Sequence, residues 1–318
     1  MIEATCPICG KICTEVHARV NDIEYFTSDA TYNMMKCTEC DVLFVDPMLK
    51  DRLNFIYPEN YYSFTGTTKK NWVVAIKEWL DRRGFRALTA SLSGRELSVL
   101  DIGGGTGWLV DQLKESDPRF TSSLIVDIDE GAHQHAVAKG HDFFLGKFED
   151  LPVSERRFDL ILMLNIIEHV SDPKLVLEKA AALLAPGGKI WVKTPNFDSL
   201  DARLFRHRSW GGYHAPRHFV LFNRSSFERL AKGAGLTTLE FSYTQGAPFW
   251  AISLLDILRR AGLAKVSAAR PSIYHPLTPI LQAAAAAFDF ARAALGGRPS
   301  QMVALLGSKP SAKARESQ

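Results

Sequence analysis

A short glycine-dense segment that follows an apolar run constrains the fold of this 318-residue chain more than any other feature. The apolar run at 99–102 leads directly into Gly103-Gly104-Gly105-Thr106-Gly107, and a helical pattern begins at Trp108. Glycines permit a tight turn and let the backbone approach a ligand within contact distance. We therefore predict a buried strand, a ligand-binding turn and a helix, in that order.

The spacing of the glycines disfavours a dinucleotide as the ligand. The dinucleotide fingerprint G-x-G-x-x-G requires a third glycine where this chain has Trp108. Asp101 would place a carboxylate near the ligand, which suits an ammonium group and a sulfonium better than a pyrophosphate. Asp127 ends the next predicted strand, where it can accept hydrogen bonds from both ribose hydroxyls of an adenosine group. We prefer Asp127 to Asp129 for this role; the alternative is a solvated acid at a strand end.

From Ser98 onward, apolar strand-like runs alternate with helical stretches, which is typical of βαβ units and a parallel sheet. We therefore predict an α/β fold with a Rossmann-like sheet flanked by helices. The expected strands cover 99–102, 124–126, 160–164, 190–192, 239–243 and 302–306, and the expected helices include 108–114, 173–184 and 225–233.

All five cysteines lie within the first 40 residues, which points to a metal site before a disulfide framework. Two C-x-x-C pairs, Cys6 with Cys9 and Cys37 with Cys40, can supply the four thiolates of a closed structural zinc site. A unit of this size has too little core to stand alone, so the metal would supply folding free energy. Cys13 has no assigned role. The alternative is a set of buried free cysteines in a small β unit.

The chain is too long for one simple core, so we expect several unequal parts. Tyr57, Tyr61 and Tyr62 introduce a connector, and Trp72 and Trp79 belong to its expected helix. The expected parts are a zinc ribbon at 1–50, an aromatic and helical connector at 51–95, a cofactor-binding core at 96–245, a helical insertion at 246–300, a final core strand at 301–308 and a polar tail at 309–318.

Over residues 95–245 the chain resembles the class I S-adenosylmethionine-dependent methyltransferases. The family's first motif matches 99–107, and its fourth-strand and fifth-strand motifs match Phe-Asp-Leu-Ile at 158–161 and Leu-Ala-Pro-Gly-Gly-Lys at 184–189. The cysteine ribbon and the tyrosine-rich segment at 57–62 are similar to a branch that modifies small metabolites or sugars. The resemblance implies a seven-stranded sheet and S-adenosylmethionine as the cofactor.

The resemblance also implies which residues contact the cofactor. Gly103, Gly105 and Gly107 would line its methionine part, Asp127 its ribose, and Phe148 with Glu149 its adenine. Asp101, Ile128 and Asn165 complete the expected cofactor-binding set.

Methyl transfer requires alignment and, for a hydroxyl or an acidic carbon, a base. His169 follows the fourth strand, whose carboxyl end should face the reacting methyl group, so His169 is a candidate base. The alternative is a histidine that packs beneath the cofactor. In similar ubiquinone-pathway O-methyltransferases an E-x-x-E-H run at this position is associated with a divalent cation. Asn165 replaces the first acid here, so we predict no catalytic metal.

The segment 210–219 combines aromatic residues with His214, Arg217 and His218. We expect His214 or His218 to bind the substrate or to remove a proton. The alternative is that this segment only orients the helix that follows it.

We expect a small-molecule acceptor or a sugar- or lipid-linked metabolite, methylated at oxygen or carbon. The run N-P-P-Y, which is typical of amino-group methyltransferases, is missing. One alternative is an RNA methyltransferase, but residues 1–50 carry eight acids against four bases, and a phosphate-reading ribbon should be basic. Another is a non-catalytic interaction module, which the intact glycine turn and Asp127 disfavour.

The N-terminus has no secretory pattern, so we expect a cytoplasmic protein. Asp256 and Asp289 interrupt the apolar runs of the insertion, so we expect no transmembrane helix. Basic residues at 259–270 lie beside apolar helical faces, so the insertion is a lid, a homodimer contact or a peripheral contact with an anionic membrane.

Overall fold

The computed structural model describes residues 2–61, 84–152, 155–207 and 209–308. Its main element is a sheet whose strands run in the order β12 (Leu236–Thr244), β13 (Gln301–Ser308), β10 (Leu184–Pro195), β9 (Phe158–Leu164), β6 (Leu97–Ile102), β7 (Phe120–Asp127) and β8 (Asp142–Leu145). β13 pairs antiparallel with both of its neighbours. The pairs from β10 to β8 are all parallel. The predicted Rossmann-like sheet of seven strands is confirmed.

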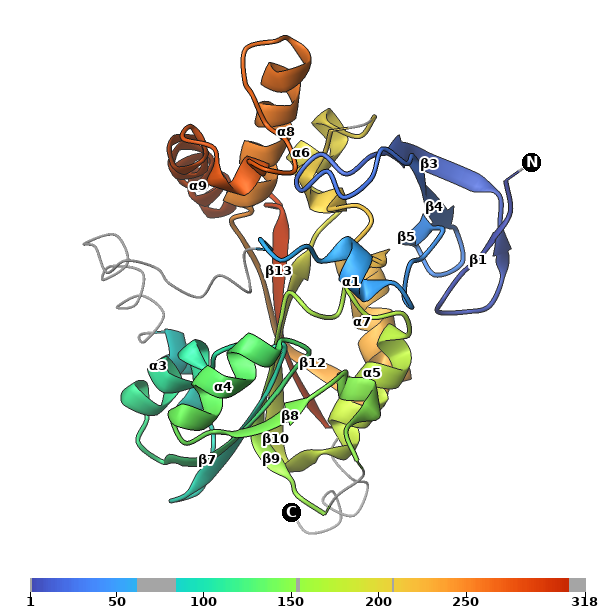
Figure 1. The fold of residues 1–318 in the computed structure, drawn as a ribbon. Coiled ribbons are helices and arrows are strands. Elements are labelled where there is room, and N and C mark those ends of the chain that lie inside the picture. The colour runs from blue at the N-terminus through green and yellow to red at the C-terminus, as the bar shows by residue number, and fades with distance from the viewer. Residues whose placement is uncertain (1, 62–83, 153–154, 208, 309–318) are drawn as a thin grey trace.

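Helices cover both faces of this sheet (Figure 1). α3 (Trp108–Ser116) and α4 (Glu130–Ala138) lie on one face, and α5 (Pro173–Ala182) and α7 (Arg224–Gly233) lie on the other. Local sequence sets their starts: the Asp172 side chain accepts from the Leu175 N–H at the start of α5, and Asn223 forms a capping box with Ser226 at the start of α7. Because the strands from β10 to β8 are parallel, their carboxyl ends meet at one edge of the sheet, where ligands of such folds bind.

Two local predictions differ from the structure. β8 was not expected, because this four-residue outer strand is only partly buried and gives no clear alternation. The helix expected at 173–184 ends at Ala182, and Pro186-Gly187-Gly188 lies inside β10, at an irregularity in its pairing with β9. The expected connector helix around Trp72 and Trp79 and the polar tail at 309–318 lie outside the described residues.

The N-terminal unit shares a sheet with the core. β1 (Ala4–Thr5) and β2 (Ile12–Cys13) form a hairpin, and β3 (Glu15–Val20), β4 (Tyr32–Cys37) and β5 (Val42–Asp46) form an antiparallel sheet. β11 (Val220–Leu221), from the core, adds to the edge of β5. One cluster of buried apolar side chains also runs through both parts. The short helix α1 (Leu53–Ile56) then leads toward the core.

A helical insertion stands between β12 and β13, as predicted. It consists of α8 (Ala247–Arg260), the 3₁₀ turn η3 (Ser272–Tyr274) and α9 (Thr278–Ala294). α8 packs against α9 and against η2 (Gly211–Tyr213), a 3₁₀ turn that follows α6 (Leu200–Leu204). Within the described ranges, every helix is too short or too polar to cross a membrane.

Candidate functional site

A cavity of about 560 Å³ opens at the carboxyl ends of β6, β7 and β9. Tyr57 and Tyr61, from the segment after the N-terminal unit, form part of its wall. The predicted cofactor-binding and catalytic residues that line it are Gly103, Gly105, Asp127, Ile128, Phe148, Glu149, Asn165 and His169. Phe148 and Glu149 belong to the 3₁₀ turn η1 (Phe148–Asp150). The structure thus brings together residues that are far apart in the sequence.

The turn after β6 requires its glycines. Gly103, Gly105 and Gly107 have φ values of +73°, +52° and +73°, a region that other residues rarely adopt. A Cβ atom on Gly103 would lie 2.1 Å from Cδ1 of Ile166. Gly107 is the residue before α3 and lies outside the cavity lining, so its role here is to start the helix.

Asp127 at the end of β7 holds the glycine turn and still faces the cavity. Its Oδ2 accepts from the Gly105 N–H at 2.8 Å, and its Oδ1 accepts from the Asp129 N–H at 3.0 Å. Burial raises the pKa of Asp127 above its ordinary value. A carboxylate offers about four acceptor positions, so two backbone donors leave capacity for a ligand's hydroxyls.

Asp101 lies behind the turn and does not line the cavity. It is 3% exposed, and a Cβ on Gly104 would come within 2.6 Å of its carboxyl group. Burial, assisted by the charge of Asp127, raises the pKa of Asp101 to about 8. Its Oδ2 has no hydrogen-bond partner within the described residues. With this pKa, the Asp101 carboxyl group is mainly protonated and neutral at pH 7, which agrees with its buried position beneath the turn.

Asn165 follows β9 with a φ of +56° and lines the cavity. Asparagine tolerates this left-handed conformation better than most residues. Its N–H donates to the Lys193 carbonyl at 2.7 Å, and its Oδ1 accepts from Gln301 at 3.2 Å. These hydrogen bonds fix the backbone between the end of β9 and His169.

His169 is fixed in one tautomer. Its Nδ1 lies 3.0 Å from the Arg217 carbonyl oxygen and 2.9 Å from the Tyr57 hydroxyl. A carbonyl oxygen only accepts, so Nδ1 carries the hydrogen and Nε2 keeps its lone pair. Burial, with the nearby charges of His214 and Arg217, lowers the pKa of His169 to about 3. The ring is thus a neutral acceptor at ordinary pH.

We expect His169 to remain neutral between pH 8 and pH 5, because its charged form would be buried. Because its pKa is lower in the folded state, His169 binds fewer protons there than in the unfolded chain. The contribution of this ring to stability is therefore lost as the pH falls from 6.5 toward 3. Burial raises the pKa of neighbouring Glu168 to about 8, so the contribution of Glu168 to stability is instead lost as the pH rises from 4.5 toward 8. The measurement is therefore ¹⁵N NMR of the ring nitrogens, with exposed His135 as the control. A His169 signal that titrates near pH 6.5 would contradict the assignment.

A second cavity of about 200 Å³ adjoins the first, and Asn165 and His169 line both. His214 and His218 line the second cavity, together with Phe249 and Ile252 of α8. The His218 Nδ1 donates to the Gly212 carbonyl at 2.8 Å, and burial lowers the pKa of His218 well below its ordinary value. The three predicted histidines therefore come together, with centroid distances of 4.6 Å from His169 to His218 and 4.8 Å from His214 to His218.

The N-terminal unit supplies two acids that sequence reasoning missed. Asp22 pairs with Arg217 at 2.6 Å, and both side chains are fully buried. Glu24 accepts from His214 Nδ1 at 2.5 Å, and His214 Nε2 accepts from Arg217 Nε at 3.1 Å. Burial alone would raise the pKa of Asp22, but Arg217 holds it well below its usual range. No local motif marks these acids, because their partners lie about 190 positions away.

Glu168, His169 and His218 form a group whose ligating atoms lie within 4.8 Å of one another. Glu168 is fully buried, and its Oε2 accepts from Thr194 Oγ1 at 2.9 Å. Its pKa of about 8 makes it a protonated carboxyl group at neutral pH. The absence of a catalytic metal at this group stays a prediction.

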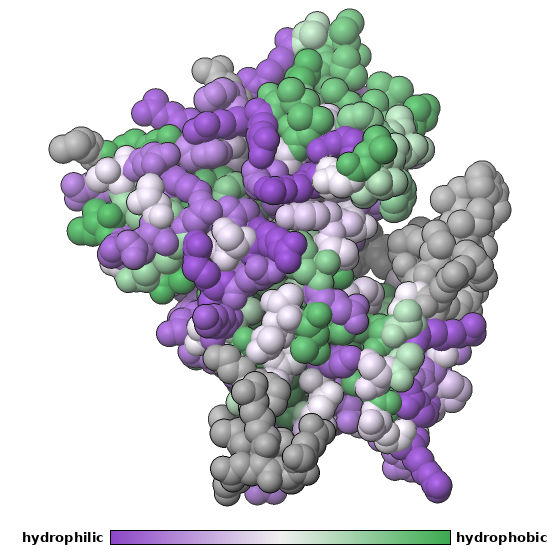
Figure 2. Space-filling view, turned by 180° about the vertical axis from the view of Figure 1, so that it is seen from behind, coloured by the Kyte–Doolittle hydropathy of each residue, from purple (hydrophilic) through white to green (hydrophobic). Residues whose placement is uncertain are grey.

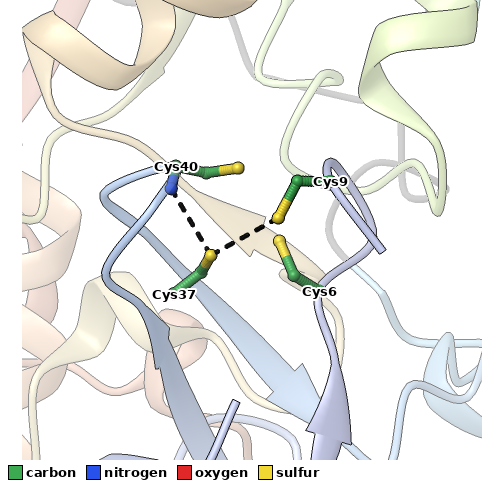
Figure 3. A group of neighbouring side chains, drawn as sticks. All are labelled: Cys6, Cys9, Cys37 and Cys40. Carbon is green, nitrogen blue, oxygen red and sulfur yellow. Dashed lines mark hydrogen bonds between the residues drawn. The ribbon is translucent and has the colours of Figure 1, made fainter. Parts of the chain in front are cut away.

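Cys6, Cys9, Cys37 and Cys40 also converge, with their sulfur atoms within 4.8 Å of one another (Figure 3). The Sγ atoms of Cys9 and Cys37 are 3.7 Å apart, and the Cys40 N–H donates to Cys37 Sγ at 3.4 Å. Zinc–sulfur bonds of about 2.3 Å in a tetrahedron place the sulfurs roughly 3.8 Å apart. The donor set therefore fits zinc. Cys13 lies outside the group.

A family model described as "Methyltransferase domain" matches residues 74–240, about half of the chain. The chain belongs to this methyltransferase family. The match contains the glycine turn, Asp127 and His169, so the residues that line the first cavity lie largely within the family's own domain.

Curated relatives of this methyltransferase include two O-methyltransferases. The malonyl-[acyl-carrier protein] O-methyltransferase of Hahella chejuensis is 29% identical over 157 residues, which cover 48% of this chain and 53% of the relative. The ubiquinone biosynthesis O-methyltransferase of Nitrobacter winogradskyi is 35% identical over 108 residues, covering 31% of this chain and 39% of the relative. The chain thus spans about half, or less, of the length of these relatives.

Two similar solved structures carry the name methyltransferase. The plantazolicin methyltransferase BpumL in complex with SAH has a TM-score of 0.47 at 15% identity, and the match covers 73% of this chain and 84% of that one. A putative sarcosine dimethylglycine methyltransferase from Galdieria sulphuraria has a TM-score of 0.47 at 16% identity, with coverages of 73% and 85%.

Proposed function

We propose that this methyltransferase transfers the methyl group of S-adenosylmethionine to an oxygen or carbon atom of a small molecule in the cytoplasm. The observation that carries the proposal is the first cavity, which joins the glycine turn and Asp127 to the fixed lone pair of His169. The two curated relatives named as O-methyltransferases support oxygen as the acceptor atom.

The residues present fit S-adenosylmethionine. Gly105 leaves open space beside the Asp127 carboxylate, whose remaining acceptor positions suit the two hydroxyls of a ribose. Ile128 and Phe148 provide apolar wall for the adenine, and Glu149 lies next to them. Gly103 and Gly105 form the wall near the methionine part.

The cofactor, when bound, supplies a methyl group activated by a sulfonium. His169 then has two tasks: its Nδ1–H bond to the Arg217 carbonyl fixes the ring, and its Nε2 lone pair accepts a hydrogen bond from the acceptor and orients it toward the methyl group. His214 and His218 form part of the wall of the adjoining cavity, where the acceptor would lie beside His169. The second cavity is small, at about 200 Å³, which supports a small-molecule group as its occupant.

We infer that Cys6, Cys9, Cys37 and Cys40 hold a structural zinc ion. Four protein ligands leave no position for water or substrate, so this ion would stabilise the fold and take no part in the chemistry.

Replacing Asp127 by Asn tests the cofactor site. Hydrogen bonds to a charged group contribute about 1.5–3 kcal/mol each, so we expect D127N to bind S-adenosylmethionine at least about 100-fold more weakly in titration calorimetry. D129N is the matched control, because Asp129 caps α4 and does not line the cavity. Wild-type protein that binds neither S-adenosylmethionine nor S-adenosylhomocysteine would overturn the proposed function.

The class of acceptor is tested with S-adenosylmethionine labelled in its methyl group. The purified protein is incubated with a metabolite extract and, separately, with total RNA. We expect label in the small-molecule fraction. Label in RNA would favour the alternative of an RNA methyltransferase and contradict the proposal.

A further inference from the structure

The outward face of α9 lacks charged side chains. The acid and the arginine of this helix turn inward: Asp289 is fully buried, accepts from the Gly246 N–H at 3.0 Å, and pairs with the largely buried Arg292 at 3.1 Å. The exposed positions of α9 are all apolar: Pro279, Ile280, Ala283, Ala284, Ala287, Phe288, Phe290, Ala291 and Ala294. A helix that faces only water normally carries polar residues on that side.

Exposed apolar side chains are concentrated on the insertion as a whole. The large hydrophobic residues that are exposed between 246 and 300 are Ile257, Leu263, Tyr274, Leu277, Ile280, Phe288, Phe290 and Leu295, which is more than half of those in the described chain. Leu263 is 74% exposed and Leu295 is 88% exposed. Figure 2 shows hydrophobic residues gathered over this upper end of the molecule, whereas the middle of the same face is largely hydrophilic. We call these eight residues the apolar end.

The exposed charge around the apolar end is basic. The insertion has two acids, Asp256 and Asp289, and both are fully buried. Its six bases include Lys265 and Arg270, which are exposed, flank the loop after Leu263, and have no ion-pair partner in the described part of the chain. Arg259 and Arg260 share the single carboxylate of Asp256. The insertion therefore offers apolar contact and carries a net positive charge of its own.

We propose that the apolar end is a docking surface for an anionic lipid membrane, on which the protein rests without crossing it. Apolar side chains of such a surface enter the lipid headgroup boundary, and lysine and arginine contact the anionic headgroups. The sign of the charge selects this occupant, because a second copy of the chain would bring the same positive rim against itself. α8 contributes Ile257 to this surface and lines the second cavity with Phe249 and Ile252.

Sedimentation with vesicles tests the proposal. We expect the full chain to sediment with vesicles of phosphatidylcholine and phosphatidylglycerol in low salt, and to remain in solution with phosphatidylcholine alone. Each basic side chain contributes about fivefold to binding, so K265Q/R270Q should bind roughly 25-fold more weakly. Added salt should weaken wild-type binding in the same way.

Phe290 and Leu175 offer a matched pair of charge substitutions. They are 59% and 48% exposed, and Leu175 lies on α5, outside the insertion. F290E should lose at least about tenfold in vesicle binding, because a charge cannot enter the apolar boundary cheaply, whereas L175E should bind as the wild type does. Both variants should keep the wild-type affinity for S-adenosylmethionine, which separates this test from the proposed function.

Three results would overturn the proposal. The first is wild-type protein that stays in solution with anionic vesicles in low salt. The second is F290E that sediments as well as L175E. The third is a concentration-dependent dimer in analytical ultracentrifugation that F290E dissociates, which would give this surface to a second copy of the chain.

Discussion

A chelator that removes zinc should unfold the N-terminal unit and also weaken cofactor binding in the core. Structural zinc sites bind with about 10–16 kcal/mol at neutral pH, and small units that contain them are unfolded without metal. Here the loss would reach further, because Asp22 and Glu24 leave their partners Arg217 and His214 when the unit unfolds. Metal content, circular dichroism and titration with S-adenosylmethionine measure the three effects.

Cysteine variants provide the control for this prediction. Cys37→Ser removes one of the four converging sulfurs and should abolish zinc binding. Cys13→Ser changes a buried cysteine outside the group and should keep the zinc. A Cys37→Ser protein that retains zinc and melts as the wild type does would contradict the assignment of the site.

Replacing Arg217 by Met should strongly destabilise the protein. The guanidinium donates to both oxygens of Asp22 and to the Ile56 carbonyl, and both charged side chains are fully buried. Removing one partner of a buried ion pair leaves the other charge without its counter-ion and costs about 3–5 kcal/mol. The free energy of unfolding in urea measures this loss.

The control for Arg217 is Arg298, which pairs with Asp198 at 2.6 Å on the surface. Its side chain is 59% exposed, so R298M should cost less than about 1 kcal/mol. D22N/R217M should recover part of the stability lost in R217M, because the double variant removes both charges of the buried pair. The prediction is wrong if R217M and R298M unfold at the same urea concentration.

The sequence was most informative where a motif is local. The strand, the glycine turn and Asp127 are contiguous patterns, and backbone geometry dictates both the residue types and their spacing. The two C-x-x-C pairs were equally clear, because metal coordination limits the ligand types and their spacing. These features were enough to predict the sheet and most of the residues that line the first cavity.

The parts that sequence reasoning missed depend on distant contacts. Glu24 and Asp22 look like ordinary surface acids in an acidic unit, and only the fold shows that they meet His214 and Arg217. Asp101 was expected near the ligand because it ends a strand, but its side chain turns behind the glycine turn. The choice among His169, His214 and His218 depends on which nitrogen each ring presents, and carbonyl partners elsewhere in the chain determine that.

The pairing of β11 with β5 affects how this protein can be divided. A catalytic fragment that begins after residue 50 would expose the edge of β11 and the guanidinium of Arg217 to solvent. The N-terminal segment therefore cannot be treated as a detachable module, and exchanging it with that of another methyltransferase would require matching acids at positions 22 and 24. The N-terminal unit is thus built into the catalytic part through β11, Arg217 and His214, although the family match begins only at residue 74.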